Sequence, residues 1–232
     1  MSEGAPVPNV RVALFDLDRT LIDCNSGHLW LRHEWNDGRV SVRDAAWAVG
    51  VLGLYGLGIG DLESAFSAAV STLAGQPESM IAERTRLWFA GQVRHRLRPG
   101  ALSALEAHRK AGHRLVVATT SSLYAAQEAA GAFGLDDVVC SRFEVVDGHF
   151  TGKLKSSAYG ANKLRRAEEW VAANGVALSE CAFYTDSVTD LALLEQVGAP
   201  VVVNPDRKLR QIAQERRWPV VDWGMSVVRL GT

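Results

Sequence analysis

The chain has 232 residues, 47% hydrophobic and 22% charged, an ordinary globular composition that allows one large domain or a core with a smaller insert. Its net charge of −1 argues against a protein that binds nucleic acid by neutralising phosphates. Three scattered cysteines without a C-x-x-C pair argue against a zinc site or a disulfide framework and, with no apolar leader at the N-terminus, favour the cytoplasm.

The first predicted element is a short buried strand that ends in two acidic residues. Residues 12–15 are all apolar, as in strands covered on both faces, and two aspartates separated by one residue, Asp16 and Asp18, follow. Two carboxylates at such a strand end are costly unless a cation compensates them, and Mg²⁺ prefers carboxylate oxygens, water and phosphate. One carboxylate could then attack phosphorus while the other exchanges protons. Alone, the motif is equally compatible with an ordinary turn.

A helical segment follows this strand. Helices are predicted at residues 28–36, 41–57, 61–73 and 78–94, because Leu, Ala and Trp recur at three- and four-residue spacings. We therefore expect residues 24–96 to form an all-helical cap domain. Residues 45–60 carry no charge, but the run is short for a membrane span and rich in glycine. Packing within the cap is the main interpretation, and contact with a membrane surface or an acyl chain is the alternative.

Beyond Pro99-Gly100 helices and strands alternate. Such alternation predicts an α/β fold, a doubly wound, Rossmann-like parallel sheet, and we expect residues 1–23 and 97–232 to form this core domain. A hairpin is predicted over residues 144–151, because Asp147-Gly148 is a strong two-residue turn signal. The predicted helices are 101–112, 123–133, 162–174, 191–197 and 206–217, and the remaining predicted strands are 114–118, 138–140, 181–185, 200–203 and 220–222.

Polar residues follow three of the predicted strands, at the edge where ligands bind in such sheets. Thr119 alone is explained by a strand-to-helix turn, whereas N-capping of the next helix would need only one residue of the pair Asp186 and Asp190. Lys163 alone is an ordinary helix lysine. Its interest comes from the need for a cation beside a charged nucleophile and a phosphoryl group.

Together these elements resemble the haloacid dehalogenase-like phosphohydrolases. The matching segments are Phe15-Asp16-Leu17-Asp18-Arg19-Thr20, the strand that ends at Thr119, Lys163, and residues 184–191. The helical insert between the first two segments is similar to the cap of the phosphoserine-phosphatase-like branch, as are residues 144–152 and 203–206. The resemblance covers essentially the whole chain, and its first and last motifs are the specific ones.

The resemblance implies a role for each matched residue. Asp16 would be the nucleophile and a metal ligand, and Asp18 would be the general acid/base and a metal ligand through its backbone carbonyl. The cap would close over the substrate and exclude bulk water. The other implied roles are phosphate binding by Thr119, the holding together of nucleophile and phosphate charges by Lys163, Mg²⁺ binding by Asp186 and support of the metal shell by Asp190.

Departures from the family pattern suggest substrate contacts. Arg19 stands where glycine or serine is commoner and could project toward the cap or the substrate. Phosphoserine phosphatases carry a glutamate for the substrate ammonium nine residues after the nucleophile, where this chain has Asn25, and a glycine pair where it has Thr120 and Ser121. A neutral Asn25 pairs weakly with an ammonium group, which disfavours phosphoserine as the substrate.

The sequence thus predicts a Mg²⁺-dependent phosphomonoester hydrolase that acts on a small alcohol phosphate through an aspartyl-phosphate. Candidate substrates are phosphoserine, another amino-alcohol phosphate such as histidinol phosphate, and a lipid phosphate such as phosphatidylglycerophosphate, which residues 45–60 mildly favour. A non-catalytic phosphate-binding module of the same fold stays an alternative. A nucleotide-cofactor oxidoreductase would need a glycine fingerprint after the first strand, which is absent. The oligomeric state stays open, because an apolar cap face can be buried internally or in a dimer.

Overall fold

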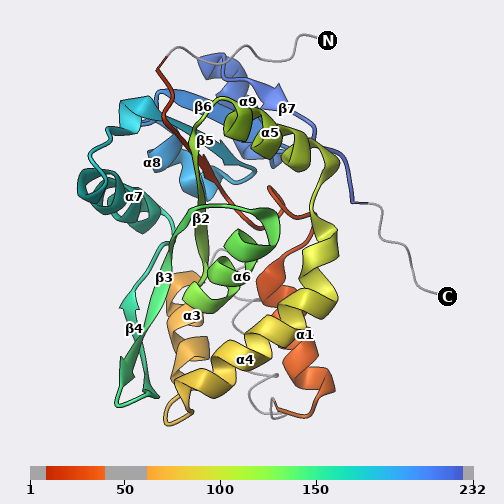
Figure 1. The fold of residues 1–232 in the computed structure, drawn as a ribbon, viewed down its shortest axis with the longest axis vertical. Coiled ribbons are helices and arrows are strands. Elements are labelled where there is room, and N and C mark those ends of the chain that lie inside the picture. Colours follow the sequence, from red (N-terminus) through yellow and green to blue (C-terminus); the bar gives the residue numbers. More distant parts are fainter. Residues whose placement is uncertain (1–8, 40–61, 227–232) are drawn as a thin grey trace, which may run out of the picture.

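The computed structural model describes residues 9–39 and 62–226, which are built around one seven-stranded sheet (Figure 1). The strand order is β4-β3-β2-β1-β5-β6-β7, and every neighbouring pair is parallel except β3 and β4. This arrangement confirms the predicted α/β class. The strands are β1 Val12–Phe15, β2 Arg114–Ser122, β3 Asp137–Val146, β4 His149–Ser156, β5 Cys181–Thr185, β6 Ala199–Val203 and β7 Val220–Val221.

Helices pack on both faces of the sheet, because successive residues of β1 point to opposite sides and all of them are apolar. Ala13 and Phe15 belong to a cluster with α5 (Pro99–Lys110) and α6 (Leu123–Phe133). Val12 and Leu14 belong to a second cluster on the other face. The helices of that face are α7 Ala161–Ala173, α8 Leu191–Leu194 and α9 Arg207–Arg216.

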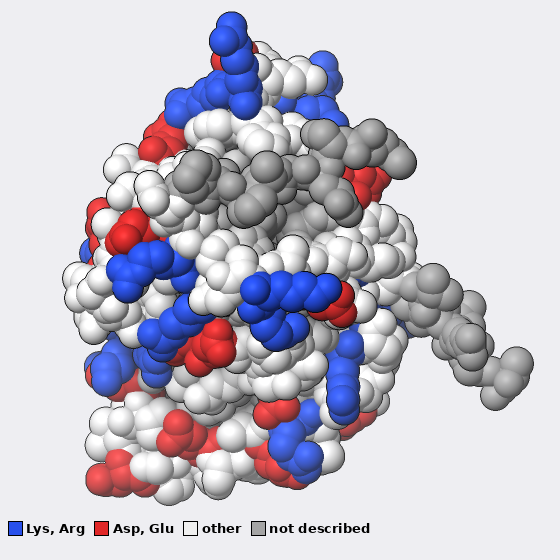
Figure 2. All heavy atoms as spheres, turned by 45° about the horizontal axis from the view of Figure 1, so that its top comes forward, with Lys and Arg blue, Asp and Glu red and all other residues white. Residues whose placement is uncertain are grey.

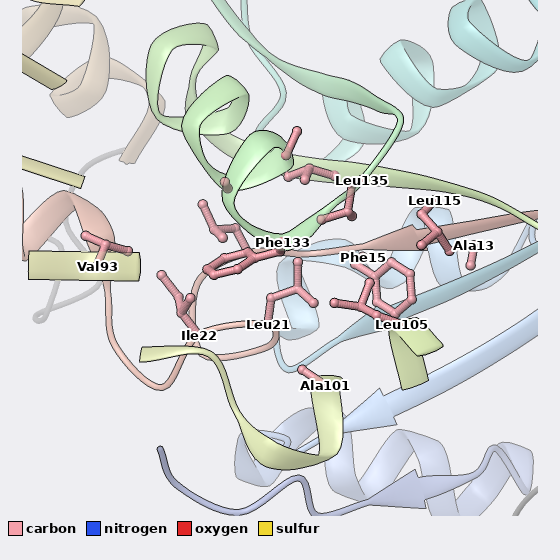
Figure 3. Packing of buried hydrophobic residues seen from close by; sticks show 14 of the residues in the cluster. Ala13, Phe15, Leu21, Ile22, Val93, Ala101, Leu105, Leu115, Phe133 and Leu135 are labelled. Carbon is pink, nitrogen blue, oxygen red and sulfur yellow. The ribbon is translucent and has the colours of Figure 1, made fainter. Parts of the chain in front are cut away.

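The first cluster also anchors the chain where it leaves β1. Figure 3 shows Leu105 of α5 and Phe133 of α6 in the same cluster as Phe15 and Leu21. Fully burying side chains of this size contributes about 1.5–3 kcal/mol each. The segment that carries Asp16 is therefore held from both of its ends by apolar packing.

The described part of the insert is helical. It contains α1 (Ser26–Asn36), α3 (Leu62–Ser71) and α4 (Glu78–Trp88), followed by a π turn over Phe89–Val93 and a 3₁₀ turn over Arg94–Arg96. The predicted continuous helix over residues 78–94 is therefore wrong at its end, because the chain widens into the π turn. The predicted helix over residues 41–57, like the uncharged run 45–60, lies outside the described residues.

The two passages between core and insert lie side by side. The amide of Asp23 donates to the carbonyl of Arg96 at 3.1 Å, and Ile22 forms an antiparallel bridge with Leu97. The amide of Arg98 donates to the carbonyl of Leu21 at 2.9 Å. This pairing agrees with domain boundaries near residues 23 and 97, which stay a prediction.

Two predicted strands are longer in the structure. β2 continues past residue 118 to Ser122, and the predicted strand 138–140 and hairpin 144–151 merge into the pair β3 and β4. Their turn is the predicted one, with Asp147 and Gly148 both at positive φ between Val146 and His149. The remaining predicted elements of the core agree with the structure to within three residues at each end.

The surface carries charges of both signs. Figure 2 shows Lys and Arg interspersed with Asp and Glu over one face, in keeping with the small net charge. In the part of the chain that the structure describes, none of the helices has the length and apolar character needed to cross a bilayer.

Candidate active site

The carboxyl ends of β1, β2 and β5 bring the predicted residues to one edge of the sheet. Phe15 pairs with Val117 on one side and with Tyr184 on the other, so the residues that follow each strand emerge together. Asp16 and Asp186 are both buried at this edge. Sequence motifs that lie far apart along the chain therefore meet, as expected for a doubly wound sheet.

Lys163 joins two of these carboxylates. Its Nζ donates to Asp16 Oδ1 at 2.9 Å and to Asp190 Oδ2 at 2.8 Å, and the lysine is only 2% exposed. It lies in the first turn of α7, which the fold directs at the carboxyl edge. Burial alone would lower the pKa of Lys163, but Asp16 and Asp190 together raise it. The lysine is thus held in its charged form.

Asp190 contacts the lysine and a neighbouring hydroxyl. Besides Lys163, Asp190 Oδ2 accepts a hydrogen bond of 2.7 Å from Thr185 Oγ1. Both contacts use the same oxygen, so this carboxylate orients the lysine that binds Asp16. These contacts agree with the role expected for Asp190 in support of the metal shell, and its place among the metal-site residues stays a prediction.

Asp16 and Asp186 carry more negative charge than their surroundings neutralise. Burial raises the pKa of Asp16 well above its usual range; Lys163 opposes the rise, and the other acidic groups add to it. Burial and Asp190 raise the pKa of Asp186 to about 6, against the opposing charges of Arg19 and Lys163. Asp186 Oδ1 also lies 3.5 Å from Thr20 Oγ1. Both carboxylates therefore lack a full set of cationic partners.

This charge excess fits a divalent cation. Among the described residues, Asp16, Asp18, Asp186 and Asp190 meet with Lys163 as their shared buried cation. The described residues contain no cluster of three His, Cys, Asp or Glu side chains with metal-site geometry. The predicted donor set does not need one, because it combines two carboxylates with a backbone carbonyl, and Mg²⁺ usually keeps water and substrate phosphate as its other ligands.

Asp18 is fixed by serines from two elements. Its Oδ1 accepts from the Ser26 amide at 2.6 Å, and its Oδ2 accepts from the hydroxyls of Ser26 at 3.0 Å and Ser121 at 3.4 Å. Burial raises the pKa of the Asp18 carboxyl, and the two hydrogen bonds from Ser26 oppose that rise. Sequence reasoning named Ser121 as a substrate contact and missed Ser26, which directly follows the N-cap Asn25.

The other candidate substrate residues divide into two groups. Arg19 is exposed and has a left-handed backbone with φ of 59°. Its positive charge opposes the rise in the pKa of Asp186. Asn25 and Thr120 instead make structural contacts: the Asn25 side chain accepts from the His28 amide at 2.9 Å, and Thr120 Oγ1 donates to the Ala158 carbonyl at 3.2 Å. Thr119 is buried within β2, before the strand ends at Ser122, and its hydroxyl accepts from the Ser121 amide.

The model of the haloacid dehalogenase-like hydrolase family matches residues 13–195 of this chain, which contain every site residue described above. The chain belongs to the haloacid dehalogenase-like hydrolase family. The family predicted from the sequence is thereby confirmed. The shared region includes the insert as well as the sheet edge that carries the aspartates.

Several proteins are similar to this haloacid dehalogenase-like hydrolase. A histidinol-phosphatase of Neisseria meningitidis serogroup C is 28% identical over 91% of this chain and 98% of its own length. An "Inhibition of morphological differentiation protein" of Streptomyces azureus is 41% identical over 55% of this chain, which spans 46% of that relative. The phosphatase name of the first relative agrees with the predicted class, a phosphoric monoester hydrolase.

Solved structures share the fold. A protein of unknown function from Bordetella pertussis Tohama I superposes with a TM-score of 0.86 at 29% identity, covering 93% of this chain and all of that one. A substrate-bound phosphoserine phosphatase has a TM-score of 0.63 at 17% identity, covering 87% of this chain and 90% of that one. The second likeness confirms the predicted resemblance in fold to phosphoserine phosphatases.

Proposed function

We propose that this hydrolase cleaves phosphate monoesters of small alcohols with Asp16 as the nucleophile and Mg²⁺ as the cofactor. The observation that carries the proposal is the contact between Lys163 and the buried carboxylate of Asp16, beside further aspartates that exceed the available positive charge. In its ionised form, which Lys163 favours, a carboxylate at the end of a buried strand can attack phosphorus, and the lysine limits charge repulsion with the incoming phosphate.

The reaction has two steps. In the first, an oxygen of Asp16 forms a bond to phosphorus, the bond from phosphorus to the alcohol oxygen breaks, and Asp18 gives its proton to that oxygen. In the second, water attacks the phosphorus of the aspartyl-phosphate, Asp18 takes a proton from the water, and Asp16 leaves as a carboxylate. Thr119 would hydrogen-bond the phosphoryl oxygens.

A metal ion fits the same group of residues. The side chains of Asp16 and Asp186 and the backbone carbonyl of Asp18 would hold Mg²⁺. The ion would neutralise negative charge on the phosphoryl group and orient it toward the nucleophile. Within this arrangement Asp190 keeps Lys163 in place through the 2.8 Å hydrogen bond.

The decisive experiment measures phosphate release from p-nitrophenyl phosphate. We expect turnover with Mg²⁺, loss of turnover after chelation, and a loss of roughly 10⁴-fold or more in Asp16→Asn. The exposed Asp37 at the end of α1 offers a matched control, and Asp37→Asn should keep wild-type turnover. Turnover that survives in Asp16→Asn would remove Asp16 as the nucleophile, and binding of Mg²⁺ and phosphate without any turnover would favour the non-catalytic module.

Among small alcohol phosphates, we propose an amino-alcohol phosphate such as histidinol phosphate ahead of phosphoserine. The support is the similarity to a histidinol-phosphatase, of which this chain covers 98% of the length. The test compares kcat/KM for histidinol phosphate, phosphoserine and a short-chain lipid phosphate. A preference for phosphoserine would overturn this assignment. A preference for the lipid phosphate would also overturn it and would favour the alternative in which residues 45–60 contact an acyl chain.

A further inference from the structure

The carboxyl group of Asp18 is held by hydrogen bonds of two chemically different kinds. Its Oδ1 accepts from the backbone amide of Ser26 at 2.6 Å. Its Oδ2 faces two hydroxyls, Ser26 Oγ at 3.0 Å and Ser121 Oγ at 3.4 Å, which lie 3.2 Å from each other. Ser26 is 2% exposed, so water competes little for these contacts.

The two serines come from different parts of the fold. Ser26 is the first residue of α1, the helix that opens the insert, and Asn25 fixes that first turn as its N-cap. Ser121 lies near the end of β2 in the sheet. The Asp18 carboxyl therefore sits between the insert and the core, in contact with both.

Donor chemistry decides which oxygen of Asp18 can carry a proton. A backbone N–H can only donate, so it favours the unprotonated form of Oδ1, which is the better acceptor. A hydroxyl can donate or accept, so either serine can rotate to accept a proton carried by Oδ2. The contacts allow Oδ2 to exist in both states without losing either partner.

We propose that Ser26, together with Ser121, positions Asp18 as the general acid by keeping its transferable proton on Oδ2, the oxygen that faces β2. This inference rests on the proposed phosphatase function and adds two positioning residues to it. The Ser121 amide also donates to the hydroxyl of Thr119, so the serine that contacts Oδ2 lies in the same segment of β2 as the proposed phosphate contact. The first turn of the insert thereby sets the geometry of proton transfer in the core.

Leaving-group dependence separates this role from a structural one. Benzyl phosphate releases an alkoxide that needs a proton, whereas p-nitrophenyl phosphate releases a stable phenolate that does not. Ser26→Ala removes the hydroxyl and keeps the amide. We expect kcat/KM to fall about tenfold for benzyl phosphate and less than about twofold for the nitrophenyl ester. Ser26→Thr should restore most of the loss, and Ser121→Ala should show a smaller loss in the same direction.

Ser122 provides the matched control. It follows Ser121 on β2, but its hydroxyl accepts from the Ala125 amide and caps α6, so Ser122→Ala should change neither ester. Thermal unfolding of each variant verifies that it is folded. If Ser26→Ala does not fold, the comparison of the two esters is made with Ser121→Ala.

The outcomes distinguish this inference from the function on which it rests. Equal losses on both esters, or no loss on benzyl phosphate, would overturn the role of the serines while Asp16-dependent turnover leaves the phosphatase assignment intact. Turnover that does not depend on Asp16, or its absence in the wild-type enzyme, would overturn both.

Discussion

The two edges of the central sheet handle buried and half-buried charge in opposite ways. At the carboxyl edge, aspartates crowd around Lys163, and the pKa of Asp186 rises to about 6 because burial and Asp190 outweigh the nearby cations. At the amino edge, arginines each find neutral or acidic oxygens. Arg109 donates to the Gly134 carbonyl at 3.0 Å, and Arg114 donates to Asp137 at 2.9 Å.

Helix direction explains the arginines of the amino edge. In this fold the C-termini of α6 and α7 point there, and their last carbonyls attract cations. Arg11 donates to the Gly175 carbonyl just beyond α7, and Arg114 reaches Asn174. Two hollows of about 490 and 410 Å³ lie between these side chains, but the arginines that line them, and Asp136, already have partners. Charge that is compensated indicates structure, whereas uncompensated carboxylates indicate a site for an incoming cation.

The largest effect is expected when the shared cation of the carboxyl edge is removed. Lys163→Met leaves Asp16 and Asp190 buried without their partner, and removing one member of a buried ion pair costs about 3–5 kcal/mol. The free energy of unfolding in urea should fall by that amount and phosphatase turnover should be lost. Lys110→Met, at the exposed end of α5, is the control and should change unfolding by less than about 0.5 kcal/mol. Equal effects in both variants would show that the contacts of Lys163 with Asp16 and Asp190 contribute nothing to stability or turnover.

Asp186 offers a test with a defined pH dependence. Its folded pKa of about 6 lies above its ordinary value of 3.8, so its contribution to stability is full below pH 3.8 and is lost as pH rises to about 6. In metal-free protein, Asp186→Asn should therefore stabilise the fold at pH 7 by about 1–3 kcal/mol and have little effect near pH 4. Urea unfolding with a chelator at both pH values measures this, and a variant less stable at pH 7 would contradict the assignment.

Adding Mg²⁺ should reverse the order of stability. Binding to the folded state alone stabilises a protein in proportion to the logarithm of metal concentration. The wild-type midpoint should therefore rise with Mg²⁺ while that of Asp186→Asn stays nearly constant. A common rise in both proteins would place the metal elsewhere.

The sequence predicts the carboxyl edge well because its motif breaks an ordinary rule. An apolar strand that ends abruptly at Asp16 and Asp18 is expensive without a cation, so the pattern itself indicates chemistry. Lys163 is predicted only together with the other motifs, because no local sequence pattern marks a helix lysine as buried. Ser26 could not be predicted, because its contact with Asp18 depends on how the first turn of α1 folds back. The π turn at Phe89–Val93 likewise leaves no mark in the sequence.

At the amino edge we expect a small effect from Arg114. Its partner Asp137 is partly exposed, and exposed ion pairs contribute about 0–1 kcal/mol. The guanidinium carbon of Arg114 also lies 4.8 Å from the centre of the Trp170 ring. Arg114→Ala should lower the free energy of unfolding by about 1 kcal/mol and leave kcat/KM unchanged. A loss of turnover would show that the two edges are coupled, so that the amino edge would not be purely structural.

At neutral pH the smallest effect is expected from His108, which links the amino edge to the middle of the sheet. One ring nitrogen lies 2.7 Å from His113 Nδ1 and the other 2.7 Å from the hydroxyl of Tyr184, whose ring stacks on Phe15. Burial, with the charge of His113, lowers the pKa of His108 to about 4. Because this folded pKa lies below the ordinary 6.5, its contribution to stability is complete above pH 6.5 and is lost as pH falls to about 4.

His108 and Asp186 therefore act on stability in opposite directions between pH 4 and 6. His108→Gln should flatten the loss of stability that acid causes over this window, and Asp186→Asn should make that loss steeper. Urea unfolding at half-unit pH steps measures both variants beside the wild type in metal-free protein. If His108→Gln steepened the acid limb, the histidine would be charged in the folded state, and the amino edge would hold an unmatched charge of its own.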